Sequence, residues 1–382
     1  MDNSQSSTFR ILSCHYINKP MVFGLIGLCS MATAVPVGIT ATGDTSPTLG
    51  DVFWVDGGDP VDTYTDVFIG DTTVSGGAVT GSLTVDSAST LETGEAFIGS
   101  GAGTYGAVTV SGAGSTWTVN QDPALNMVPE DEDFGEIDSD GAIVVGDEGK
   151  GELTIESSAQ VTALNMYLAD SSTGDGTVLV DSAATLTVAD TIEVGFEGAA
   201  SMTVQGASSV VNTNSLIVGV ESGADGTLTV TDSGTLNTDI EQPGVTYTDP
   251  SKFVVGEFGT GTMTVTNGGV VNSGAASIGL ESGSTGTVTV GGGAAAASWN
   301  VAGNLDIGKA GAGTLTLANG GTVDVDGATE LGADGGTGSL VFSGGTLNTG
   351  TLGADVSALS GTGTINTSGL AGLLSKVTFN AG

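Results

Sequence analysis

The sequence predicts an all-β fold, a right-handed parallel β-helix (β-solenoid) of about ten coils with a period near 24 residues. Glycine supplies 65 of the 382 residues, more than twice its usual share, yet the Gly-X-Y period of collagen is missing. Apolar residues, 39% of the chain, are mostly Val, Leu, Ile and Ala, and only 13% of residues are charged. This composition is typical of many short strands joined by tight turns.

A short strand closed by glycine recurs along the chain and defines the repeat. The usual spacing is near 24 residues, and two steps, which end at Gly146 and Gly256, are much longer. A second strand of the pattern Gly-Thr-apolar-Thr-apolar follows, and a third short apolar strand completes the unit. The clearest second strands are 226–230, 261–265, 286–290 and 313–317. The closing residues are Gly70, Gly99, Gly146, Ala169, Gly195, Gly219, Gly256, Gly279, Gly308 and Gly332.

One coil of a three-sided parallel β-helix needs about this many residues, because it holds three strands of ~4–5 residues and three turns. Alternation along the second strand places Leu228 and Val230 inward and Thr227 and Thr229 outward. Equivalent residues then stack ~4.8 Å apart, and glycine can supply a positive φ at each corner. An antiparallel sandwich or propeller is the alternative, since short strands at regular spacing also occur there.

The chain divides into four parts. Residues 1–34 are interpreted as a signal peptide, 35–66 as an N-terminal segment and cap, 67–350 as the repetitive β-helix, and 351–382 as a degenerate last coil and tail. Insertions are expected at about 120–140 and 238–252, where four of the eight prolines fall. Within the cap, Phe53, Trp54 and Tyr64 are expected to cover the first open coil.

The first 34 residues have the layout of a secretory leader. Arg10 and Lys19 precede an apolar run over 21–35, and cleavage is expected after Ala34. A retained membrane anchor is the alternative, although the run is shorter than the ~20 residues that a span needs. We therefore expect a secreted or cell-surface bacterial protein whose mature chain does not insert into the membrane.

Loss of the leader would remove most reactive side chains. Both cysteines, the histidine and the arginine lie in it, and the remaining four lysines and 42 acidic residues give a formal charge of −38. A Ser-His-Asp or Cys-His catalytic set and a His/Cys metal site are thereby excluded, and nucleic acid would be repelled. A polysaccharide-active β-helix enzyme (lyase or hydrolase) that uses carboxylates stays open, although few lysines are present to neutralise an acidic sugar.

The repeat is similar to the type V secretion and PEP-CTERM-associated repeat, a glycine-rich bacterial unit of pattern Val-Gly, then Gly-Thr-Leu-Thr-Val, then Gly-Gly-Thr-Val. Residues 255–271 and 307–323 match it most closely, and the similarity covers about 67–350. The resemblance implies an exported, autotransporter-passenger-like β-helix or adhesin-like stalk, and it carries no catalytic residue. The sequence has neither a C-terminal barrel pattern nor a Pro-Glu-Pro segment, so the resemblance leaves the secretion route open.

The first insertion contains a candidate calcium loop. Glu136, Asp138, Asp140 and Asp147 occupy positions 1, 3, 5 and 12 of a twelve-residue loop, with Gly141 at position 6. No cofactor is required by the sequence, and Ca²⁺ is the ion that these oxygen ligands suit. A solvated acidic loop is the alternative interpretation.

A hydrophobic stripe is expected on the outer surface of the N-terminal half. The residue two positions before the closing glycine points outward, and in the first four coils it is Phe68, Phe97, Val144 and Tyr167. Such a patch usually marks a contact, here with surface glycans or matrix proteins. The alternative is a stripe covered by the N-terminal segment or by the first insertion.

The outward Thr-x-Thr pairs of the second strands permit one further interpretation, an ice-binding face. Interruptions at Glu152 and at Val178-Leu179 argue against it, and the β-propensity of threonine explains the pairs. The sequence therefore predicts a structural or adhesin-like protein of the cell surface or extracellular matrix, without catalytic activity.

Overall fold

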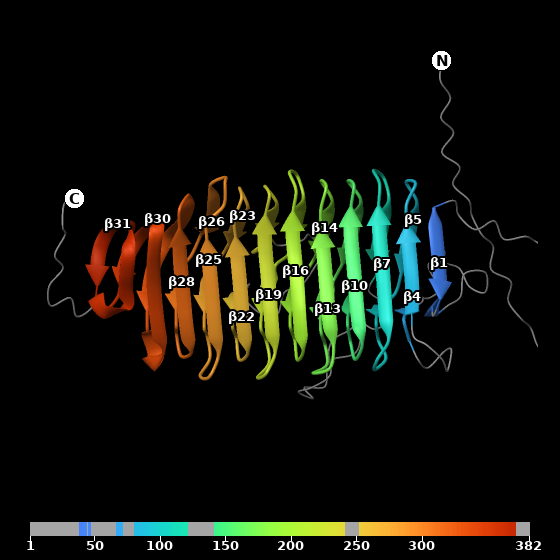
Figure 1. Cartoon of the computed structure of the whole chain (residues 1–382), viewed down its shortest axis with the longest axis horizontal. Helices are drawn as coiled ribbons and strands as arrows, with labels where there is room; N and C mark the ends of the chain where they lie inside the picture. The colour runs from blue at the N-terminus through green and yellow to red at the C-terminus, as the bar shows by residue number, and fades with distance from the viewer. Residues whose placement is uncertain are drawn as a thin grey trace, which may run out of the picture.

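The computed structural model describes residues 38–43, 45–46, 66–71, 80–120, 141–240 and 252–371. About ten coils with a spacing of roughly 25 residues stack in parallel into a rod that runs from β3 (Val67–Ile69) to β31 (Leu359–Ala371) (Figure 1). Helical structure in the described residues is confined to two 3₁₀ turns, η2 (Ala333–Gly335) and η3 (Val356–Ala358). The predicted all-β solenoid and its period are confirmed.

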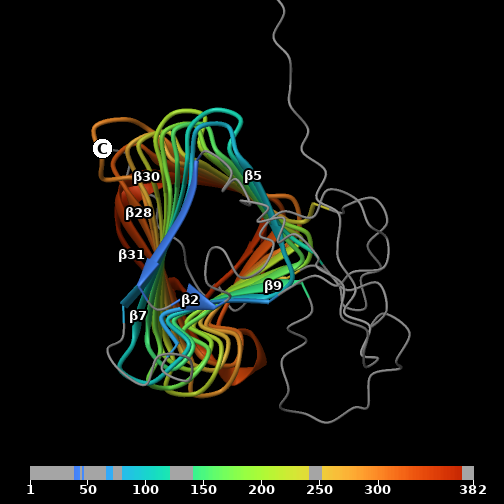
Figure 2. The same cartoon turned by 90° about the vertical axis from the view of Figure 1, so that its right-hand side faces the viewer.

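Each coil contributes one strand to each of three faces, which surround the core when the rod is seen end-on (Figure 2). The first face holds β3, β6 (Ala96–Ile98), β9 (Ala142–Val145), β12 (Asn165–Leu168), β15 (Thr191–Val194), β18 (Ser215–Val218), β21 (Phe253–Val255), β24 (Ala276–Ile278) and β27 (Leu305–Ile307). The second face holds β4 (Thr80–Val85), β7 (Tyr105–Ser111), β10 (Lys150–Glu156), β13 (Asp175–Val180), β16 (Ala199–Gln205), β19 (Asp225–Thr231), β22 (Thr260–Val265), β25 (Thr285–Val290) and β28 (Ala312–Ala318).

The third face completes each coil and leads the chain back to the first face. It holds β5 (Thr90–Thr93), β8 (Thr116–Val119), β11 (Gln160–Ala163), β14 (Thr185–Val188), β17 (Val210–Asn212), β20 (Thr235–Asn237), β23 (Val270–Ser273) and β26 (Ala297–Val301). The last strands, β29 (Gly321–Leu331), β30 (Thr337–Gly353) and β31, bend through corners and serve more than one face.

The strands pair in a register that places like residues above like residues. Thr227, Leu228 and Thr229 of β19 lie opposite the equivalent residues of β22, which in turn lie opposite those of β25. Leu228 and Val230 are fully buried, while the threonines between them are partly exposed. The predicted alternation is therefore confirmed, and the core is a continuous column of aliphatic side chains inside the three faces.

The solenoid continues across both interruptions of the repeat. On either side of the first, β9 pairs with β6 and with β12. On either side of the second, β21 pairs with β18 and with β24. Most of both expected insertions, at 121–140 and 241–251, lies outside the described residues.

Two antiparallel strands cover the N-terminal end of the stack. β1 (Ile39–Gly43) pairs with β4 of the second face, and β2 (Thr45–Ser46) pairs with β3 of the first face. Because these strands run against the direction of the coils, they satisfy the outer backbone edges of β3 and β4 without continuing the helix. The aromatic residues expected in the cap, Phe53, Trp54 and Tyr64, lie outside the described residues.

Glycine closes the first-face strands because two backbones meet there. At Gly99 the φ angle is 73°, and an added Cβ atom would lie 2.2 Å from the carbonyl oxygen of Lys150 in the next coil. The other predicted closing glycines have the same left-handed conformation, and Ala169, with φ of 56°, adopts it in their place. Every one of these corners has a positive φ, and at Gly99 the backbone of the next coil also leaves no room for a side chain.

Replacement of Gly99 by alanine should destabilise the rod through two effects: the strain of a positive φ and the clash of the new Cβ atom with the carbonyl oxygen of Lys150. Gly103 is the matched control, because its φ is 75° and nothing lies within 4 Å of an added Cβ atom. Gly103→Ala should cost about 1–2 kcal/mol, the usual penalty of a left-handed alanine. Gly99→Ala should cost clearly more in urea unfolding, and equal losses in the two variants would contradict the backbone contact.

A ladder of asparagine side chains runs along the outside of the third face. The Nδ2 atom of Asn237 donates to Oδ1 of Asn212 at 2.9 Å, and Asn272 and Asn300 each donate to the preceding rung at 2.8 and 2.7 Å. Each amide points its donor toward the N-terminal end. The ladder breaks at Asp324, which lies opposite Asn300 and has no side-chain donor.

Replacing Asp324 by asparagine should complete this ladder. The new Nδ2 atom can donate to Asn300, while Oδ1 can still accept from Asn348, as the carboxylate does now. We expect a gain of about 1 kcal/mol in the free energy of unfolding, the usual net worth of one hydrogen bond. Asp326→Asn removes the same charge at an exposed position nearby and should change stability less. An equal increase in the free energy of unfolding in both variants would show that the added hydrogen bond of the ladder does not stabilise the protein.

Candidate functional site

One column of outward side chains on the first face differs from the rest of the surface. We call it the outer column. Parallel register stacks its members one above another, and they lie two positions before each corner. Its members, in order, are Phe68, Phe97, Val144, Tyr167, Glu193, Ile217, Val254, Ser277, Asp306 and Glu330.

The N-terminal part of the outer column forms an apolar cluster separate from the core. The rings of Phe68 and Phe97 stack with their centroids 4.9 Å apart and their planes 6° apart. Val144 and Tyr167 are 1% and 9% exposed and cluster with Ala142 and Phe97. The expected stacking of these side chains is present. Because Val144 and Tyr167 are buried, the expectation of a contact surface at these two residues is corrected, and only Phe68 and Phe97 stay accessible in part.

A second apolar cluster lies further along the outer column. Ile217 and Val254 are 5% and 3% exposed, and Val220, Phe196 and Leu280 pack with them. Sequence reasoning missed this cluster, although both residues stand two positions before a closing glycine. An apolar residue at that position, which identified the N-terminal stripe, would also have identified this cluster.

Glu193 lies between the two clusters, with Tyr167 on one side and Ile217 on the other. Burial raises its pKa to about 8, and the negative charge of Glu257 adds to the effect. Its Oε2 atom is buried and has no hydrogen-bond partner among the described residues. With this pKa the side chain is mostly a neutral carboxylic acid at neutral pH, it lies between the two apolar clusters, and Oε2 is free to accept a hydrogen bond.

Other carboxyl groups surround Glu193 in the corner turns. Burial, with the nearby charges of Asp147 and Glu197, raises the pKa of Asp170 to about 6. Burial also raises the pKa of Glu257, although Lys252 lies beside it with 3.7 Å between Nζ and Oε1. The region thus combines an acid that keeps its proton with a carboxylate that is paired with an ammonium group.

Of the four candidate calcium ligands, only Asp147 lies within the described residues, and positions 7 to 10 of the loop form β9. Glu136, Asp138 and Asp140 lie outside the described residues. Asp147 follows Gly146 at a corner, and burial together with the neighbouring Glu148 raises its pKa to about 6. Within the part of the chain that the structure describes, no group of three or more acidic, histidine or cysteine side chains has the geometry of a metal site.

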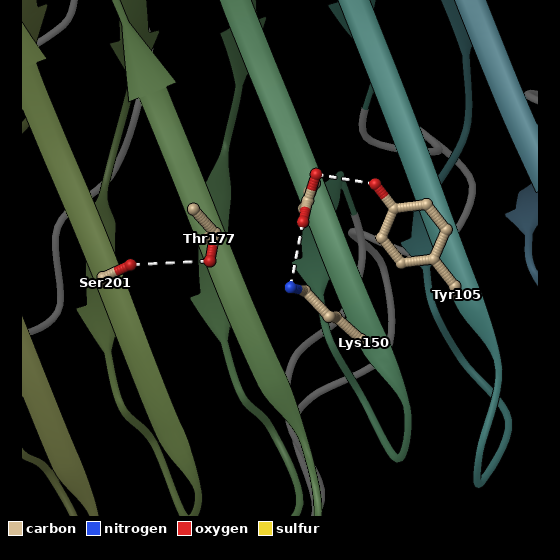
Figure 3. Close-up of polar contacts among 5 residues, drawn as sticks. Tyr105, Lys150, Thr177 and Ser201 are labelled. Carbon is tan, nitrogen blue, oxygen red and sulfur yellow. Dashed lines mark hydrogen bonds and ion pairs between the residues drawn. The ribbon is translucent and has the colours of Figure 1, made fainter.

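The second face carries the outward threonine columns and one polar cluster that interrupts them. The Tyr105 hydroxyl donates to Oε2 of Glu152 at 2.6 Å, and Lys150 Nζ lies 3.0 Å from Oε1 of Glu152 (Figure 3). This hydrogen bond raises the pKa of Tyr105 to about 12. Further along the face, Ser201 donates to Thr177 at 3.5 Å, a long and weak contact. The expected interruption of the threonine face at Glu152 is therefore an organised ion-pair cluster.

An open hollow lies on the third face near the C-terminal end. Its lining includes Asp324, Asn348 and Asn366, which continue the column of the asparagine ladder. It is remote from Glu193 in the chain and contains no lysine. Among the described residues, no helix is long and apolar enough to cross a membrane.

Comparison of the chain with known protein families, with curated proteins and with solved structures finds no match. The outer column and its carboxyl groups are therefore interpreted from their geometry alone.

The protonated state of Glu193 predicts an unusual pH dependence of stability. Its folded pKa of about 8 exceeds its ordinary value of 4.5, so the native protein binds this proton more tightly than the unfolded chain does. The stabilisation is complete below the ordinary value and is lost as the pH rises through about 8. Glu193→Gln keeps the shape without the charge, and it should match the wild type in urea unfolding at about pH 5 and exceed it at about pH 8.

Glu330→Gln is the control for this pH experiment, because Glu330 is an exposed carboxylate of the outer column that takes no part in the carboxyl cluster around Glu193. It should shift the urea midpoint little at either pH. An equal gain from Glu193→Gln at both pH values would show that the carboxyl group is not held neutral.

Proposed function

We propose that this protein is an exported bacterial β-helix of the cell surface or extracellular matrix, structural or adhesin-like in role and without catalytic activity. The uninterrupted stack of coils is the observation that supports this best, because a rod with an apolar core and three solvent-facing sheets provides length and repeated outer surface. The similarity of the repeat to the type V secretion and PEP-CTERM-associated unit supports the same assignment.

The chemical inventory supports a binding or structural role. A chain that carries no histidine, cysteine or arginine after residue 34 lacks the Ser-His-Asp and Cys-His catalytic sets, and carboxyl groups are its main candidates for acid–base chemistry. Surface glycans and matrix proteins are the proposed partners, and the stacked Phe68–Phe97 pair is the proposed contact, since aromatic faces pack against sugar rings. We propose that Ca²⁺ binds Glu136, Asp138, Asp140 and Asp147 and reduces repulsion within the acidic insertion.

A glycan array tests this function on the exported protein, with and without Ca²⁺. N-terminal sequencing of the sample should show cleavage after Ala34. We expect binding to at least one glycan class, and Phe97→Ala should weaken it by about tenfold, as expected for loss of an aromatic anchor at a contact. Phe258→Ala is the control, because this ring is 46% exposed on the shaft, away from the stacked pair.

The glycan array, N-terminal sequencing and a calcium titration test three parts of the proposal separately: the glycan contact, export through a cleaved leader and the calcium site. Equal losses of glycan binding in Phe97→Ala and Phe258→Ala would contradict the proposal that the Phe68–Phe97 pair contacts the glycan. An intact Met1 would contradict export through a cleaved leader. The absence of a calorimetric signal at millimolar Ca²⁺ would dismiss the calcium site.

One observation favours a second function, carboxylate catalysis on a polysaccharide. A protonated Glu193 has the property that a general acid needs, and the Glu257–Lys252 pair lies in the same region of the first face. An assay for reducing or unsaturated sugar ends separates the two functions. Release of such ends by the wild type and not by Glu193→Gln would establish the enzyme, whereas the structural proposal expects none.

A further inference from the structure

The two ends of the solenoid are finished differently. At the N-terminal end, Leu83 and Val85 of the first coil are 1% and 0% exposed beneath β1. At the C-terminal end, Leu359 and Ile365 of β31 continue the inward columns but stay only partly buried. Leu370, the next apolar residue that continues an inward column, is 49% exposed. The last described coil thus presents an apolar end that the first coil does not.

The backbone edge of β31 is also open within the described part of the chain. β31 pairs with β30 along its 13 residues, and no other described strand pairs with it. Its sequence, LSGTGTINTSGLA, contains neither a charged residue nor a proline. Natural edge strands usually carry such residues because an unprotected edge pairs with another strand.

The same end of the rod is almost uncharged in an otherwise strongly acidic protein. Asp355 is the only charged residue between 335 and 375, whereas the whole chain has a formal charge of −37. Electrostatic repulsion between two copies is therefore weakest when their C-terminal ends approach. Side-by-side contact would instead bring the acidic shafts together.

The N-terminal cap decides which end of a second copy can dock. Head-to-tail stacking would need the outer edges of β3 and β4, and these are already occupied by β2 and β1. Two C-terminal ends, in contrast, face each other across a twofold axis perpendicular to the rod. This arrangement makes the facing β31 strands antiparallel and closes the assembly at two copies.

We propose that two copies of this chain dock through the open edge of β31 and its exposed apolar residues, C-terminal end to C-terminal end, as a twofold dimer. The dimer buries Leu370, Ile365 and Leu359 of both copies and pairs two backbone edges. It doubles the length of the rod and places the two capped ends, with their stacked Phe68–Phe97 pairs, at opposite tips.

Light scattering and small-angle X-ray scattering of the chain purified without its leader test the dimer. We expect twice the monomer mass and a maximum dimension near 100 Å for the coils, against about 50 Å for one stack of ten coils at ~4.8 Å each. Leu370→Asp should weaken association at least about tenfold, because the twofold axis brings the new charges together. Phe258→Asp, at a ring 46% exposed on the shaft, should leave association unchanged.

Deletion of residues 372–382 separates the second copy from the chain's own tail as the occupant of the edge. A dimer in both the intact and the shortened protein supports the proposal. A monomeric intact protein overturns the proposal. If the shortened protein then dimerises, the chain's own tail occupies the edge of β31; if it stays monomeric, the edge binds neither the tail nor a second copy. The proposal is also overturned by a dimer whose maximum dimension equals that of the monomer and whose association Leu370→Asp does not weaken.

Discussion

The structure depends on the close approach of two backbones at the corner after each first-face strand. At the glycine corners from Gly70 to Gly308 the chain turns with a positive φ while the backbone of the next coil lies where a side chain would begin. This contact keeps neighbouring coils in one register, so that the inward columns form one continuous core. The glycine-rich composition is thus a requirement of the stacking distance.

Fixed register turns every outward position into a column, and each column concentrates one kind of chemistry. Amides form a directional ladder on the third face, hydroxyls follow the second face, and apolar side chains gather on the first. Glu193 stands out because it lies between apolar residues of such a column, and burial of its carboxyl group there raises its pKa. Its altered protonation is therefore a product of stacking.

The features that recur in every repeat could be predicted from the sequence. The period, the inward Leu228 and Val230, and the positive φ at the closing glycines were all predicted, because each depends on residues within one coil. The burial of Val144 and Tyr167 was expected only as the alternative to a contact surface, and the environment of Glu193 was not predicted, since it depends on side chains of neighbouring coils. The asparagine ladder had a readable signal in the recurring third-strand asparagines, but its donor direction required the structure.

Because each coil contacts only the coils beside it, the unit of structure and the unit of sequence coincide. Unequal recombination between repeats in the gene would therefore add or remove whole coils without disturbing the capped end or β31. Each event would change the rod by one step of ~4.8 Å. Length is then a heritable quantity that can vary while the surface chemistry of the shaft stays the same.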